Sequence, residues 1–337
     1  MRASTARLTN SLIRLSELTF PAADRLIQRT RLAFIHLDNL LAFAKRDRDG
    51  RVDGYLATYL PEECVLTFLR RGEAVNACSL TASGREVITI TDALHRMKAE
   101  LERGELTYCT APLEQLAWMY QSCAAHVEPL PVEAGDSDAL LTRLAQGGAN
   151  GILELIADGR VSYLRFERGR PTGGYFTDKP ESLTPVKFVE SEVRGRTGRP
   201  PALSAAMFRP VADLPTQASR SLISTYREVY WRMVDAVEKE FPTEARRRAQ
   251  KVCAGIEDIH QAIRVLSAPR GTEPPDMVVQ AEDLAGALSD WSLQLLEGIE
   301  VVMPGIAPGI LREATREHRF VLQSAGFYSR LPWQVAW

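Results

Sequence analysis

The feature that most constrains the fold of this chain is a weak internal repeat in its first two thirds. Residues 54–72 and 151–169 both begin with glycine, carry leucine two positions later and end in Arg-Gly. The second stretch starts 97 residues after the first. Self-similarity at a single offset indicates that one structural unit occurs twice.

Each copy has the pattern of a helix followed by a β-hairpin and a returning strand. In the second copy, 152–156 and 161–166 are rich in aliphatic and aromatic residues, and the later run alternates with period two. Asp158-Gly159 lies between them, and a type I′ hairpin turn requires positive φ at both central residues. We therefore predict a hairpin that turns at this pair.

The first copy follows the same order with different turn residues. Its hairpin is predicted to turn at Pro61-Glu62-Glu63. A short helical pattern precedes each copy, and a later extended segment follows each. These flanking elements are predicted at 37–44 and 140–144 for the helices, and at 106–110 and 206–210 for the late strands.

The remaining segments of the first two thirds separate and flank the copies. Proline, glycine and acidic residues at 128–138 predict a linker, and a helix is predicted before it near 112–126. Leucines within 1–30 predict an amphipathic N-terminal helix that docks on the protein's own core. The alternative is that this arginine-bearing helix lies on a membrane surface. An α+β fold is therefore expected, with a first module and its N-terminal helix over 1–130, a second module over 131–215, and a helical bundle with an aromatic tail over 216–337.

The last third changes to the period of amphipathic helices from about residue 216. Short connections between successive helices predict an antiparallel bundle. Four helices are predicted. The first ends at Phe241-Pro242, and the second runs from Thr243 through Ile259 to Leu266. The third begins at a cap on Asp276, and the fourth runs over 310–324.

The tail after Gly326 is aromatic and carries little charge. Large apolar side chains of this number rarely stay in water on a soluble monomer. We expect the tail to fold back across the bundle, and Pro332 predicts an extended segment there rather than a helix. The alternative is that the tail docks on a partner or on a second copy of the chain.

Composition limits the class of partner and the compartment. The net charge is −2, from 41 basic and 43 acidic side chains, so no global field attracts nucleic acid. No apolar run is long enough to span a membrane. Five scattered cysteines do not form a disulfide framework, and we expect reduced thiols and a cytoplasmic location.

Three motifs nearly match a binding site and fail at required positions. The stretch 45–56 has the glycine of a calcium loop, but lysine and leucine occupy its first and last ligand positions. Gly169 to Gly174 has the glycine spacing of a phosphate loop without its lysine. Cys123 and His126 lack a second ligand pair at zinc spacing. The sequence therefore predicts no metal, no cofactor and no catalytic residues.

Two histidines and two arginine clusters remain as weaker signals. His260 and His318 lie on predicted helices, as a phosphorelay histidine would, but neither has the surrounding residues of that relay. The run 246–248 and the loop 194–199 are arginine-rich and could contact phosphates. A solvated face or an acidic protein surface explains both clusters better at this net charge.

The first copy resembles the PATAN domain, a family found in bacterial signalling proteins and often placed beside receiver domains. The resemblance rests on the leucine helix at 37–41, the glycine-x-leucine strand at 54–56, the strand at 66–68 and the segment 71–77. It covers 35–80 of the chain and implies an α+β module that mediates protein–protein contact.

The second copy resembles the same family over 138–178. Gly174 stands at a position where the family has alanine, and in the first copy Leu69 takes the place of a phenylalanine. The shared positions are apolar residues and glycines. The resemblance therefore implies a fold and an interaction role, and it carries no catalytic residues over.

These observations predict a non-enzymatic adaptor or scaffold in bacterial signal transduction. Its expected partners are proteins, such as a signalling or motility component, and a homodimer is left open. The alternative is a small-molecule sensor or enzyme with a site at the interface of the two modules, and a phosphorelay bundle is a third. A polar-lined pocket between the modules would favour the sensor, and a solid interface would favour the adaptor.

Overall fold

The structure is a computed structural model, and it describes residues 13–46, 52–125, 127–195, 199–273 and 277–337. The chain forms two compact units, Met1–Pro215 (unit 1) and Thr216–Trp337 (unit 2). Unit 1 contains two antiparallel sheets with helices against them, so the prediction of a mixed α+β chain is confirmed. Among the helices described, none is long and apolar enough to cross a membrane.

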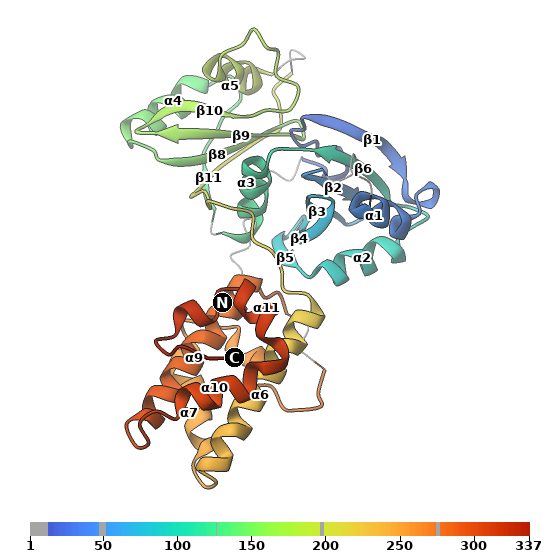
Figure 1. Cartoon of the computed structure of the whole chain (residues 1–337). Helices are drawn as coiled ribbons and strands as arrows, with labels where there is room; N and C mark the ends of the chain where they lie inside the picture. Colours follow the sequence, from blue (N-terminus) through green and yellow to red (C-terminus); the bar gives the residue numbers. More distant parts are fainter. Residues whose placement is uncertain (1–12, 47–51, 126, 196–198, 274–276) are drawn as a thin grey trace. The chain divides into compact units, whose positions relative to one another are not determined.

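The first sheet of unit 1 has the strand order β1-β6-β2-β3-β4-β5 (Figure 1). Its strands are β1 (Asp24–Arg31), β2 (Gly54–Tyr59), β3 (Glu63–Arg70), β4 (Glu73–Thr81), β5 (Gly84–Ile88) and β6 (Glu105–Thr110), and its helices are α1 (Leu37–Arg46), α2 (Ile90–Ala99) and α3 (Leu113–Ala124). Alternate strand residues face opposite sides. Leu56 and Val65 pack with Met97 of α2, whereas Tyr55 and Leu66 belong to the core that contains α3.

The second sheet has the order β10-β9-β8-β11-β7. Its strands are β7 (Glu128–Leu130), β8 (Gly151–Ala157), β9 (Arg160–Glu167), β10 (Arg170–Tyr175) and β11 (Leu203–Phe208), and its helices are α4 (Ser137–Gln146) and α5 (Pro185–Arg194). Leucines of α4 and valines of α5 bury one face of this sheet. Three residues of the predicted linker form β7, which pairs with β11.

The two copies have matching strand registers and matching turns. The late strand β6 pairs with β2, and the late strand β11 pairs with β8. Arg71 and Arg168 both have positive φ, at 51° and 50°, and the glycines after them have 77° and 76°. Asp53 Oδ1 accepts a hydrogen bond from the Arg71 N–H (2.7 Å), and Asn150 Oδ1 accepts one from the Arg168 N–H (2.8 Å).

The glycines that open the two copies are required by the neighbouring strand. A Cβ atom at Gly54 would lie 2.1 Å from the carbonyl oxygen of Cys109 in β6. At Gly151 it would lie 2.7 Å from the carbonyl oxygen of Phe208 in β11. Only glycine lets these backbones approach so closely. The Asp158-Gly159 turn also has positive φ at both residues, 47° and 79°, as predicted.

The N-terminal helix predicted over 1–30 is wrong for the residues described. Residues 1–12 lie outside the described part. From Ile13 onward the chain forms a single 3₁₀ turn (Leu15–Glu17) and then strand β1. Leu18 is fully buried, and the backbone of Thr19 bonds to Gly159 and Val161 of the second sheet. Leu18 is therefore buried by an irregular segment that bonds to a neighbouring strand.

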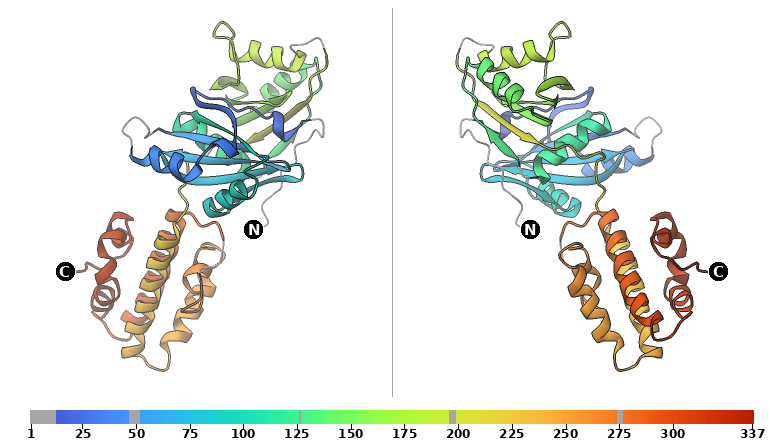
Figure 2. Two further views of the ribbon diagram at one scale, coloured as in Figure 1. Left: turned by 90° about the vertical axis from the view of Figure 1, so that its right-hand side faces the viewer. Right: turned by 90° about the vertical axis from the view of Figure 1, so that its left-hand side faces the viewer.

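Unit 2 is helical around one apolar core that includes Tyr226 and Trp291. Its helices, drawn in yellow to red, are α6 (Arg220–Glu240), α7 (Ala245–Ile256), α8 (Ile263–Leu266), α9 (Ala281–Glu300), α10 (Ala307–Thr315) and α11 (Arg319–Ser324) (Figure 2). Helix α6 contacts α7, α8, α9 and α10. The predicted cap on Asp276 lies outside the described residues.

Two helices of the last third are shorter than predicted. The helix predicted to continue through Ile259 ends at Ile256, and Ile259 is 76% exposed. Residues 257–259 form a turn, and the His260 imidazole after it bonds to Asp290 Oδ2 (2.6 Å). The helix predicted over 310–324 is interrupted by a 3₁₀ turn, Arg316–His318.

The aromatic tail folds back on unit 2, as expected. Phe327 and Leu331 are buried in the helical core, and Trp333 packs against it. A short 3₁₀ turn (Tyr328–Arg330) precedes an irregular segment around Pro332. Trp337 is 51% exposed and contacts the Tyr328 ring edge-on at 5.7 Å.

We predict that the aspartate and the asparagine that accept hydrogen bonds in the two Arg-Gly turns are interchangeable. Asp53→Asn and Asn150→Asp should leave the free energy of unfolding nearly unchanged, because either side chain offers the acceptor oxygen. Asp53→Ala and Asn150→Ala should each lower it by about 1 kcal/mol. Urea unfolding monitored by circular dichroism measures the difference. Equal losses for the swaps and the alanine variants would contradict the shared turn design.

The docked tail gives a second prediction about stability. Phe327→Ala should destabilise unit 2 by about 3–5 kcal/mol, because it leaves a cavity in the core. Trp337→Ala should cost much less, since half of that side chain is already exposed. Thermal melting of both variants compares them, and equal melting temperatures would show that the tail does not contribute to the core.

Candidate functional site

The near-match motifs of the sequence do not assemble into sites among the described residues. The centre of the calcium-like stretch (47–51), His126 and residues 196–198 of the arginine loop lie outside the described part. Gly169 lies in the turn between β9 and β10, where a Cβ would meet the Ala145 backbone of α4 at 2.6 Å. Its positive φ and this close approach explain the glycine without a phosphate.

The two candidate relay histidines are each bonded to a carboxylate. Contrary to the prediction, neither lies in an α-helix: His260 follows α7, and His318 is in a 3₁₀ turn. His260 Nε2 lies 2.6 Å from Asp290 Oδ2, and His318 Nε2 lies 2.9 Å from Glu228 Oε2. Both side chains are about four-fifths covered, at 19% and 20% exposure. This arrangement favours structural roles for both imidazoles.

The two sheets of unit 1 share a packed core around α3 (Figure 1). Leu116 and Met119 of α3 lie in one cluster with Tyr55 of the first sheet and Ile152 of the second. Tyr163 and Phe208 of the second sheet pack edge-on at 6.4 Å in the same cluster. The centre of the interface between the two halves of unit 1 is therefore filled by apolar side chains.

A buried ion pair crosses this interface. Arg85 of β5 donates to Glu154 of β8 through both terminal nitrogens, at 2.6 and 2.8 Å, and the two side chains are 6% and 4% exposed. Arg85 also contacts the Ser122 carbonyl at the end of α3 (3.4 Å). Burial alone would lower the pKa of Arg85. The charge and hydrogen bonds of Glu154 outweigh burial, so this pKa lies above its usual value.

Four of the five cysteines fill the same core as free thiols. These are Cys64, Cys78, Cys109 and Cys123. Burial raises the pKa of Cys64 far above its usual range. A hydrogen bond with Cys78 lowers the pKa of Cys123, and the nearby charge of Arg85 acts in the same direction. The thiols are covered on all sides and serve as small apolar side chains.

The rim of the same interface contains a polar cleft of about 330 Å³. Its walls come from Asp24, Arg25 and Gln28 on the first half and from Thr177 and Asp178 on the second. Arg25 faces Asp178 at 3.9 Å. The volume is at the lower end for a ligand pocket, and such pockets are mostly apolar.

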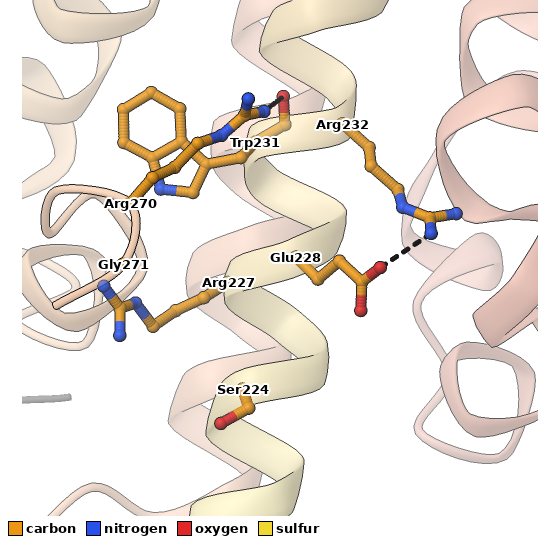
Figure 3. A pocket seen from close by; sticks show the side chains of 7 residues that line it. All are labelled: Ser224, Arg227, Glu228, Trp231, Arg232, Arg270 and Gly271. Atoms are coloured by element: carbon orange, nitrogen blue, oxygen red, sulfur yellow. Dashed lines mark hydrogen bonds and ion pairs between the residues drawn. The ribbon is translucent and has the colours of Figure 1, made fainter. Parts of the chain in front are cut away.

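Unit 2 contains a groove of about 460 Å³ on α6 (Figure 3). The residues that line it are Ser224, Arg227, Glu228, Trp231, Arg232, Arg270 and Gly271. Ser224, Arg227 and Trp231 recur at intervals of three and four residues, which places them on one side of the helix. Arg270 and Gly271 come from the loop after α8 and form the opposite wall.

The loop wall is held by Arg227 and Trp231. The Arg227 guanidinium donates to the carbonyl oxygens of Thr272 (2.8 Å) and Pro269 (2.8 Å), and its Nε–H has no partner among the described residues. The Trp231 indole donates to Ala268 O (3.2 Å), and the Arg270 guanidinium lies 5.2 Å above the Trp231 ring. The groove is thus walled by a fixed indole with an arginine stacked on it.

The charges around the groove are arranged on two sides of α6. In Figure 3 Trp231 and Arg227 point toward the loop, whereas Glu228 and Arg232 point the other way. Arg232 bonds to Glu228 (2.6 Å) and to Glu317 (2.5 Å). Glu228, Glu317 and His318 lie close enough to suggest a metal site, but Arg232 already neutralises the carboxylates. Arg227, by contrast, has no carboxylate partner among the described residues.

Sequence reasoning did not find this groove. The apolar stripe predicts the helix, whereas the groove lies on its polar side. A tryptophan between two arginines on that side was the available signal, because Trp and Arg are enriched where proteins bind one another. The loop that forms the other wall could not be placed from the sequence.

No protein family, curated protein or solved structure matches this chain. The assignment of a function therefore rests on the geometry above.

We predict that the Arg85–Glu154 pair is far more costly to break than to replace. Arg85→Met and Glu154→Leu should each lower the free energy of unfolding by about 3–5 kcal/mol, since each leaves a buried charge alone. The double variant should recover most of that loss. Urea unfolding of the parent protein, the two single variants and the double variant completes a double-mutant cycle, which gives the coupling energy of the pair.

The exposed pair Arg264–Glu257 provides the control for this cycle. Its coupling energy should not exceed about 1 kcal/mol. A coupling energy for Arg85 and Glu154 as small as that of the control pair would show that the buried pair does not join the two halves.

Proposed function

We propose that this protein is a non-enzymatic adaptor that binds other proteins in bacterial signal transduction, within the cytoplasm. The observation that carries the proposal is the groove on α6. It offers an indole, a stacked arginine and a buried guanidinium that bonds to loop carbonyls and has no carboxylate partner among the described residues. The space fits a few side chains of a partner. Aromatic and arginine side chains of this kind dominate the energetics of protein interfaces.

One edge strand of each sheet, β1 and β10, is less suited to binding a partner strand. The edge strand β1 carries three arginines and has two register shifts against β6. The edge strand β10 contains Pro171 and a further shift. Charges, bulges and proline are the features by which natural sheets prevent edge pairing. A partner is therefore expected on helices.

The resemblance of both repeats to the PATAN domain supports the same class of function. On this proposal unit 1 holds two related interaction modules, 1–130 and 131–215, that arose by duplication. Their matching registers and Arg-Gly turns support the duplication. Residues 216–337 form an antiparallel bundle that binds a second partner. A signalling or motility component is the expected class of partner.

Site-specific photocrosslinking in the native host tests this proposal. A benzophenone amino acid in place of Ser224 should crosslink a discrete protein, because that position lines the groove and is exposed. Trp231→Ala should then weaken binding of the purified partner by about tenfold or more. Calorimetry with full-length proteins measures the affinity.

The matched control places the same crosslinker at Gln250, an exposed position on α7 outside the groove. It should give no such product. Identical crosslinking at both positions would indicate random collision and would contradict the adaptor proposal.

A second candidate function is favoured by the polar cleft at the rim of the unit 1 interface. On this alternative the protein senses a small polar molecule bound between Arg25 and Asp178. Ligand screening by thermal shift would find a compound whose stabilisation is lost in both Arg25→Gln and Asp178→Asn. Stabilisation retained in both variants would exclude the cleft as its site.

A further inference from the structure

A second surface of unit 2 collects positive charge and exposed aromatic rings. It lies on the helical stretch from Ala307 to Ser324, which comprises α10, a 3₁₀ turn and α11. We call it the arginine face and define it by Arg312, Arg316, Arg319, Phe320 and Trp337. None of the site residues discussed above belongs to it.

The acidic residues of this stretch are neutralised by α6. Glu313 is paired with Lys239, and Glu317 is paired with Arg232 at 2.5 Å. Both carboxylates therefore face α6. Buried residues of α10, among them Leu311 and Ala314, pack in the helical core.

The arginines of the stretch have no such partners. Arg312, Arg316 and Arg319 are spaced four and three residues apart, which places them on one side of a helical segment. Arg312 and Arg316 are exposed. Among the described residues, no carboxylate lies within ion-pair distance of any of the three. The stretch thus presents three arginines that have no carboxylate partner among the described residues.

Two exposed aromatic rings adjoin these charges. Phe320 is 69% exposed and Trp337 is 51% exposed. The guanidinium carbon of Arg319 lies 4.4 Å from the centre of the Phe320 ring and 5.7 Å from that of Trp337. Contacts of this kind orient the guanidinium and keep both rings beside it.

From these contacts we infer that the arginine face binds an acidic segment of a partner protein, one that also carries a large apolar side chain. Two or three carboxylates would pair with the arginines, and the apolar side chain would pack beside Phe320 and Trp337. The inference rests on the proposed adaptor function and adds the chemistry of the partner. Arg and Trp are the residue types that most often dominate binding energy at protein interfaces.

Charge considerations favour a protein segment over other anions. Recognition of anionic lipids typically uses clusters of about four to eight basic residues. This stretch has three arginines and two carboxylates. Three phosphate contacts would also support only weak, strongly salt-dependent binding to nucleic acid. A few carboxylates with one apolar anchor match both the number of charges and the aromatic pair.

The direct test measures binding of a short fluorescein-labelled peptide of glutamates with a central leucine and phenylalanine to the full-length protein. Fluorescence anisotropy should show saturable binding that weakens as salt is added. The triple variant Arg312→Glu, Arg316→Glu, Arg319→Glu should weaken it by about a hundredfold, because each reversal replaces attraction with repulsion. Phe320→Ala should weaken it by about tenfold with little change in the salt dependence.

A charge-matched control separates this face from a general effect of charge. Arg220, Arg247 and Lys251 are exposed residues of unit 2 outside the face. Their triple reversal to glutamate changes the net charge equally but leaves the residues of the face in place, so it should change the affinity by less than about threefold at physiological salt. An equal loss in the control variant would overturn the inference. All variants are first compared with the parent protein by thermal melting.

Other outcomes overturn the choice of partner or separate it from the proposed function. Tighter, arginine-dependent binding to phosphatidylserine vesicles or to oligothymidine than to the peptide would assign the face to lipid or nucleic acid. If a partner crosslinked at Ser224 binds the arginine triple variant unchanged, this inference fails and the adaptor function stands. If no partner is crosslinked but the peptide binds as predicted, the adaptor proposal fails and the anion-binding face remains.

Discussion

The ion pair between Arg85 and Glu154 constrains how the two sheets of unit 1 are oriented. Each sheet is closed on one face by its own helices, and their other faces meet in a shared apolar core. Apolar contacts are non-directional, so they would tolerate several relative rotations of the two sheets. A bidentate guanidinium–carboxylate contact fixes distance and angle together. Because both groups are buried, any arrangement that separates them leaves a buried charge without a partner, and its desolvation costs much free energy.

The repeat explains why much of unit 1 could be predicted from the sequence. Its signals are backbone requirements: a positive φ at Asp158 and at the Arg-Gly turns, and the missing Cβ at Gly54 and Gly151. These requirements act locally and restrict the residue type at fixed positions. They can therefore be recognised in the sequence without knowledge of the tertiary structure. The N-terminal segment shows the opposite case. Its leucines are spaced for a helix, but pairing of Thr19 with a distant strand overrides that local preference.

The same distinction separates the predicted from the unpredicted parts of unit 2. The apolar stripe of α6 predicts the helix because burial of that stripe is the main reason that the helix forms. Helix α7 ends at Ile256, and His260 just after it hydrogen-bonds to a residue of α9. A contact between residues so far apart in the sequence cannot be predicted from a local pattern. The groove is harder still to predict from the sequence, because one of its walls is a loop whose position is fixed by hydrogen bonds from Arg227 to loop carbonyls.

The two surfaces of unit 2 follow from how its charges are distributed. Arg232 and Lys239 of α6 neutralise the carboxylates of the stretch from α10 to α11, and in doing so they hold that stretch against the core. Among the described residues, the three arginines of that stretch have no carboxylate within ion-pair distance. Pairing that stabilises the fold on one side thus creates uncompensated charge on the other. A partner with the opposite charge is the arrangement that would neutralise it, and the exposed rings beside Arg319 would lose contact with water in the same step.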